Sequence, residues 1–178
     1  KRASWMILGS IGLALTVTMG MHLRASNVID GTDLRLISRL QVLSGPAAIG
    51  ISRAIDLVLS PAGGVMLIAV LTIAISTLQS RNVSRKGLQT AAAFATIVLV
   101  PWVCAYAIKM IVGRPRPVGR LLSGTTQPWD SSFPSGHVAL ATGLVTGLTF
   151  LAGHSKARWL VVTLGVAFIA TVGWSRVL

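Results

Sequence analysis

Acidic residues are scarce in this sequence. It contains no glutamate, and its side-chain carboxylates come from four aspartates: Asp30, Asp33, Asp56 and Asp130. Because Mg²⁺ and Ca²⁺ are bound mainly by carboxylate and other oxygen ligands, a carboxylate-built divalent-metal site is not expected. There is also a single cysteine, Cys104, inside an apolar run, so the sequence offers neither an internal disulfide nor a cysteine metal cluster.

Charge of either sign is uncommon as well. Charged residues make up 11% of the chain, against about 25% in an ordinary soluble domain, while 53% of the residues are hydrophobic and the mean hydropathy is +0.75. These values argue against a soluble globular fold. The 16 lysines and arginines give a net charge of +12, but they lie between long uncharged runs, so a membrane protein is favoured over a nucleic-acid binder.

Uncharged runs close to the roughly 20 residues that a helix needs to cross a bilayer cover residues 3–23, 57–80, 87–108, 131–155 and 159–175. They predict an all-α, integral-membrane helical bundle with five transmembrane helices in one domain over residues 1–178. The first run is long for a signal peptide and has no Ala-x-Ala-like cleavage site, so a retained helix is favoured. Small residues within the runs favour close helix packing in lipid, as at Gly143, Thr146, Gly147 and Thr149.

Between the first two runs, residues 27–56 mix charged and apolar side chains at helical spacing. Leu36, Leu40 and Leu43 fall on one stripe, with Arg35 and Arg39 off it. This pattern predicts an amphipathic segment at the membrane interface or against the bundle. The dipeptide at positions 45–46, Gly-Pro, should interrupt it.

A basic cluster follows the third run, with Lys109, Arg114 and Arg116 beside Pro115 and Pro117. The prolines favour a turn over a continued helix. Cations without an acidic neighbour in sequence predict an anionic ligand, because arginine suits bidentate phosphate contact and lysine adds a point charge. For Lys109, an interface anchor that snorkels is an equal alternative. The loop counts of Lys and Arg favour a cytoplasmic N-terminus only if this cluster is kept for chemistry.

The fourth run begins with the sequence Ser-Phe-Pro-Ser-Gly-His at positions 132–137. A helix start with a serine cap and exposed backbone N–H groups suits a phosphate, which the helix dipole also favours. His137 falls in the first turn of that helix, where it suits a general acid, although a lone histidine is often structural. His22 and His154 end their runs and are expected at the interface.

Together these residues resemble a known family. Residues 109–117 match K-x6-R-P, residues 134–137 match P-S-G-H, and Ser175-Arg176 matches the start of S-R-x5-H-x3-D, in the order found in the type 2 phosphatidic acid phosphatase (PAP2) superfamily of membrane lipid phosphatases. The resemblance implies a six-helix bundle, of which this sequence holds five helices. It also implies a cell-membrane location, here a bacterial inner membrane, with the active site on the extracytoplasmic side. Hydrolysis would be metal-independent, without a cofactor, through a covalent phosphohistidine.

By this resemblance the residues that hold the phosphate are Lys109, Arg116, Ser135, Gly136 and Arg176, and His137 protonates the leaving oxygen. Arg114 also precedes a proline, but the K-x6 spacing selects Arg116. The nucleophilic histidine, its orienting aspartate and the sixth helix would fall after Leu178. The sequence is accordingly interpreted as a fragment that cannot complete the family's mechanism.

The predicted function is therefore a membrane phosphatase for a lipid phosphate or diphosphate. An isoprenoid diphosphate such as undecaprenyl diphosphate, phosphatidic acid and phosphatidylglycerophosphate all remain open, and no oligomeric state is predicted. The alternative is a non-catalytic membrane protein of the same fold that binds anionic lipid headgroups. A histidine six positions after Arg176 would favour the enzyme.

Overall fold

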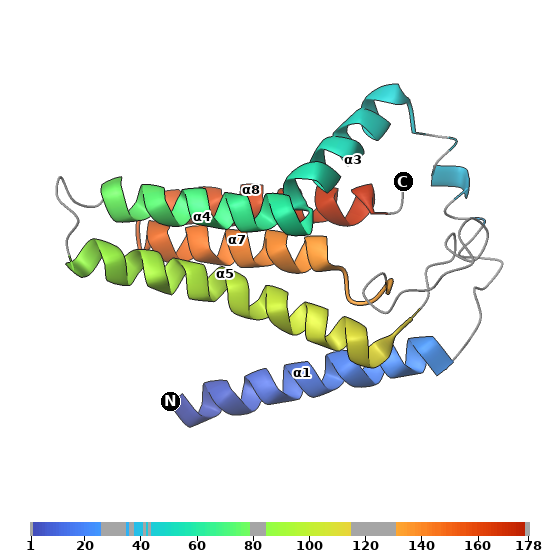
Figure 1. The fold of residues 1–178 in the computed structure, drawn as a ribbon, viewed down its shortest axis with the longest axis horizontal. Coiled ribbons are helices and arrows are strands. Elements are labelled where there is room, and N and C mark those ends of the chain that lie inside the picture. The colour runs from blue at the N-terminus through green and yellow to red at the C-terminus, as the bar shows by residue number, and fades with distance from the viewer. Residues whose placement is uncertain are drawn as a thin grey trace. The chain divides into compact units, whose positions relative to one another are not determined.

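The computed structural model describes residues 2–25, 35, 38–40, 42, 44–78, 85–114 and 131–176. All regular secondary structure in these residues is helical, which confirms the predicted all-α class. The helices are α1 (Arg2–Ala25), α3 (Pro46–Leu59), α4 (Pro61–Leu78), α5 (Arg85–Val112), α7 (Gly136–Ala152) and α8 (Ala157–Ser175) (Figure 1).

Three of these helices, α4, α5 and α8, are long and apolar enough to cross a membrane. Helix α7 is apolar but has 17 residues. Helix α1 has 24 residues and covers the first predicted run. It is not one of the candidate spans found in the described residues. The helices are thus compatible with a membrane protein, whereas the predicted number of five spans is not confirmed.

A serine separates α3 from α4. The Ser60 hydroxyl accepts a hydrogen bond from the Gly63 N–H at 3.1 Å, and the Ser60 carbonyl accepts one from the Gly64 N–H at 2.7 Å. Pro61 follows as the first residue of α4, a position where its missing N–H costs nothing. The predicted run 57–80 therefore begins inside α3, and the candidate span begins at Pro61.

The chain forms two compact units, one of residues 1–36 and 104–135, the other of residues 37–103 and 136–178. In the second unit α7 and α8 form an antiparallel pair, and α3 contacts α4, α7 and α8 (Figure 1). The fully buried side chains of this unit include Phe94, Val98, Leu140 and Val172. These side chains form the apolar core of the second unit.

Glycines in α7 allow close packing against α5 in the same unit. A Cβ at Gly143 would lie 3.1 Å from the Val98 backbone, and one at Gly147 would lie 2.7 Å from the Phe94 ring. The prediction of small-residue packing is confirmed at these two positions. The threonines differ, because Thr146 and Thr149 donate their hydroxyls to carbonyls of their own helix, as threonine commonly does within helices.

The first unit contains α1 and the last part of α5. Gly20 of α1 is buried, and a Cβ there would lie 2.7 Å from the Val112 side chain and 2.9 Å from the Phe133 ring. Nearby, Arg24 donates to the Val112 carbonyl at 3.0 Å, which satisfies one of the carbonyls left open at a helix end.

The predicted amphipathic segment is described only in part. Arg35 and Arg39 are exposed and Leu40 is half-buried, as the stripe requires, while Leu36 and Leu43 lie outside the described residues. The expected interruption at positions 45–46 is confirmed, because α3 starts at Pro46.

Candidate functional site

His137 is the second residue of α7 and comes directly after Gly136, which is buried. Its side chain is 16% exposed, and its Nε2 atom lies 3.1 Å from the Asp56 Oδ1 atom. Asp56 belongs to α3 and is 57% exposed. The start of α7 therefore carries a largely buried imidazole that faces a solvent-accessible carboxylate.

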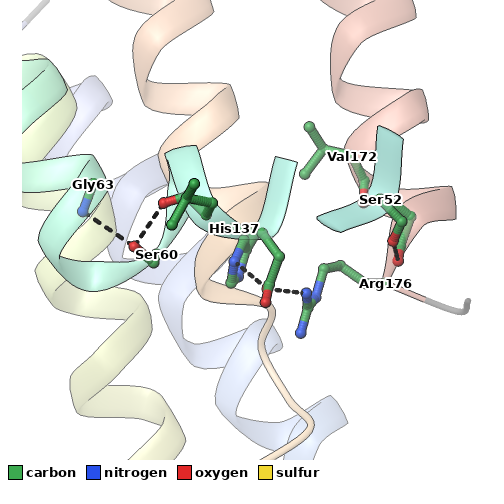
Figure 2. A network of polar contacts seen from close by, with 9 residues as sticks. Ser52, Ser60, Gly63, His137, Val172 and Arg176 are labelled. Carbon is green, nitrogen blue, oxygen red and sulfur yellow. Dashed lines mark hydrogen bonds and ion pairs between the residues drawn. The ribbon is translucent and has the colours of Figure 1, made fainter. Parts of the chain in front are cut away.

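The same carboxylate oxygen binds a cation from a third helix. Arg176 directly follows α8, and its NH1 group donates a hydrogen bond to Asp56 Oδ1 (Figure 2). Asp56, His137 and Arg176 are far apart in sequence, yet all three lie in the second unit. We refer to them below as the Asp56 cluster.

Backbone contacts fix the end of α8 beside this cluster. Ser52 of α3 donates to the Ser175 carbonyl at 2.7 Å (Figure 2). The Ser175 hydroxyl, in a side chain that is almost fully buried, donates to the Val172 carbonyl at 2.8 Å. Helix α3 thus contacts both residues of the Ser175-Arg176 dipeptide, Ser175 through a neutral hydrogen bond and Arg176 through an ion pair.

In the first unit, Lys109 occupies the last turn of α5. It is 6% exposed, its Nζ donates to the Ser131 carbonyl at 2.8 Å, and the Ser131 hydroxyl donates to the Lys109 carbonyl at 3.1 Å. The Nζ also lies 5.9 Å from the centre of the Tyr106 ring, within cation–π range. A snorkelling anchor would extend its ammonium into water, so the burial of Lys109 does not fit that alternative.

Helix α5 ends three residues after Lys109, at Val112. Gly113 has a φ of +56°, and its N–H donates to the Lys109 carbonyl at 2.8 Å, which is the hydrogen bond of a left-handed helix end. Beyond it, the Arg114 carbonyl accepts hydrogen bonds from the Ser132 N–H at 2.8 Å and from the Ser132 hydroxyl at 3.2 Å. The predicted turn is confirmed at Gly113, before the prolines.

A sequence model of the PAP2 superfamily matches residues 88–178, just over half of the chain. The chain belongs to the PAP2 superfamily. No curated protein and no solved structure matches it. The matched residues contain all of the predicted site positions: Lys109, Arg116, Ser135, Gly136, His137 and Arg176.

Within the PAP2 region, the structure brings two of these side chains together. His137 and Arg176 meet at the Asp56 oxygen, and Gly136 precedes His137 at the start of α7. Lys109 and the half-buried Ser135 belong to the other unit. Arg116 lies outside the described residues.

Sequence reasoning missed Asp56. It lies before the PAP2 match, and no motif includes it. The available signal was its rarity, because it is one of four acidic residues and stands between apolar neighbours in α3. Among the described residues, no three His, Cys, Asp or Glu side chains come together as a metal site would require.

Proposed function

We propose that this PAP2 protein hydrolyses the phosphate or diphosphate ester of a membrane lipid through a phosphohistidine, without a metal. Membership of the PAP2 superfamily supports phosphatase activity on a phosphorylated substrate. The observation that carries the site assignment is that His137 and Arg176, from two separate motifs, contact one carboxylate oxygen. An imidazole and a guanidinium that reach the same small anionic group can also reach one phosphate.

In this proposal, the donors neutralise the phosphoryl oxygens while the ester bond breaks. Arg176 and Arg116 supply guanidinium groups and Lys109 an ammonium, and the start of α7 supplies backbone N–H groups near Ser135 and Gly136. A histidine expected after Leu178 forms the bond to phosphorus. The leaving lipid oxygen takes a proton from His137, and water then hydrolyses the phosphohistidine and returns that proton.

A lipid substrate follows from the apolar helices. Three helices compatible with membrane spans allow the tail to stay in the hydrocarbon layer while the headgroup reaches the basic residues of the three motifs. We extend this to five spans in a bacterial inner membrane, with the site on the extracytoplasmic side. Isoprenoid diphosphates, phosphatidic acid and phosphatidylglycerophosphate all satisfy this chemistry.

Turnover of a lipid phosphate by the full-length protein in detergent tests this function. Arg116→Ala should reduce turnover by about a hundredfold or more, as expected for loss of a charge stabiliser, and Arg114→Ala should reduce it less. Activity should survive EDTA, and vanadate should inhibit it. Equal, mild losses at both arginines would remove the phosphate assignment, and no turnover with retained binding of anionic lipid vesicles would favour the non-catalytic alternative.

The orientation has a separate test in intact cells. In a Cys104→Ala background, Ser123→Cys should react with an impermeant maleimide, because the basic loop is placed outside, while Asn82→Cys should not. Detergent permeabilisation serves as the control that both thiols can react. Labelling of the second position alone would place the site in the cytoplasm.

A further inference from the structure

Asp56 is the one member of the cluster that the PAP2 match does not include. We propose that Asp56 is a positioning residue for His137, which fixes the orientation of the imidazole and favours its protonated form. The inference rests on the function proposed above, in which His137 gives a proton to the leaving oxygen. In this role Asp56, a residue of α3 outside all three motifs, would assist the protonation of the leaving oxygen.

The geometry gives Asp56 this position. Its Oδ1 atom lies 3.1 Å from the His137 Nε2 atom, a distance at which a protonated imidazole donates to a carboxylate. Imidazolium carries an N–H on each ring nitrogen. A protonated ring can therefore pair with Asp56 and still hold a second N–H.

The charges in the cluster favour the same conclusion. Arg176 contacts the same oxygen, so without the carboxylate an imidazolium would face a permanent cation, and like charges at close range disfavour the protonated form. One anion between two cations removes this conflict. Asp56 therefore sets how readily His137 holds a proton while Arg176 remains next to it.

The other elements packed in this unit supply few competing charges. Helix α4 has no ionisable residue, and α7 has none besides His137. Arg158 stands at the opposite end of α8 from Arg176, and Arg85 and Lys86 stand at the start of α5. On α3 itself, Arg53 is exposed one turn before Asp56. Among these described groups, the Asp56 carboxylate is the charge placed against Nε2.

The exposure of Asp56 limits the expected effect. Its side chain is 57% exposed, and water screens such a pair more than a buried one. Asp56→Asn should therefore weaken the acid step without abolishing it, whereas loss of the imidazole should remove it. The amide keeps the shape of the side chain and removes its charge.

The first experiment compares pH profiles of kcat and KM for the full-length protein and Asp56→Asn on a lipid phosphate. The variant should lose about tenfold in kcat at neutral pH, a part of what a general acid contributes. The descending limb of its kcat profile should move to lower pH, because its imidazole gives up the proton sooner. KM should not rise, because removing the anion leaves the phosphate site more positive.

Two further variants separate this role from a structural one. Ser52→Ala removes the neutral hydrogen bond between α3 and the end of α8 and leaves the carboxylate, so its pH profile should match that of the unchanged protein. Asp56→Glu keeps the negative charge, so the descending limb of its kcat profile should stay near its original pH. An unshifted profile in Asp56→Asn, or equal shifts in Ser52→Ala, would overturn the proposal. So would a lower KM with undiminished kcat, because the carboxylate would then only compete with phosphate.

The second experiment does not depend on turnover. In protein with ¹⁵N-labelled histidine, the His137 signal is identified by its loss in His137→Ala and titrated with and without Asp56→Asn. Its midpoint should move to lower pH in the variant, and an unchanged midpoint would overturn the proposal. If the protein lacks phosphatase activity, this titration still decides whether Asp56 controls the imidazole proton, so the two failures are distinguishable.

Discussion

The end of α5 and the Asp56 cluster both hold a cation that a phosphate would need, but they hold it differently. Lys109 is 6% exposed and donates to the backbone carbonyl of Ser131. Arg176 is 23% exposed and pairs with the carboxylate of Asp56, which is itself mostly accessible to water. The lysine belongs to the packed interior of its unit, while the arginine sits at an accessible, charged site.

This difference predicts which property each substitution changes. A buried polar group that loses its partner costs about 1–3 kcal/mol, whereas an accessible ion pair contributes about 1 kcal/mol or less. Changes at the end of α5 should therefore lower both stability and turnover. Changes of the accessible Asp56–Arg176 pair should lower turnover and leave the free energy of unfolding nearly unchanged.

The largest effect should come from His137→Ala. Turnover should fall by about a hundredfold or more, because the leaving oxygen loses its proton donor. The free energy of unfolding should also fall, by about 0.5–3 kcal/mol, because the imidazole is largely buried. His154→Ala, at an exposed position between α7 and α8, is the matched control and should affect neither. A loss of turnover in His137→Ala no greater than in His154→Ala would contradict the role assigned to His137.

A matched pair at the two cations should come next. Lys109→Met should lower the free energy of unfolding by about 1–3 kcal/mol, because the Ser131 carbonyl loses its buried donor. Arg176→Met, at the partly exposed site, should cost about 1 kcal/mol or less. Unfolding by SDS in mixed micelles measures both, and equal costs would contradict the distinction between the two regions.

The smallest effect should come from the left-handed glycines. Gly113 and Gly153 have φ values of +56° and +58°, so Gly113→Ala and Gly153→Ala should each cost about 1 kcal/mol of stability. The Gly113 N–H donates to the Lys109 carbonyl at the helix end, so substitution of Gly113 should also reduce turnover. Gly153 lies in the α7–α8 turn and should leave turnover intact. Equal turnover in the two variants would show that the helix end does not position the lysine.

The sequence predicted the features that depend on local chemistry. Uncharged runs lie over helices, and the prolines at positions 115 and 117 correctly predicted that α5 would not continue through the basic cluster. The run 131–155 overestimated a helix, because Pro134 precedes the start of α7 at Gly136. Uncharged length alone therefore does not give the length of a span.

The Asp56 cluster was not predictable, since its contacts join residues far apart in the chain. Asp56 is 120 positions from Arg176, and no periodic pattern connects a position in α3 with the end of α8. The burial of Lys109 has the same origin. It depends on Ser131, 22 positions away, and sequence alone left anion binding and snorkelling equally open.

The hydrogen bonds between Arg114 and Ser132 have a consequence for variation. They join the chain on either side of residues 115–130, so these two points stay together however many residues lie between them. The closure entropy of a chain segment grows only with the logarithm of its length, so doubling the number of residues would cost about 0.6 kcal/mol. Insertions placed away from Arg116 should thus cost little stability, and this stretch can change its length while Arg114 and Ser132 keep their connection.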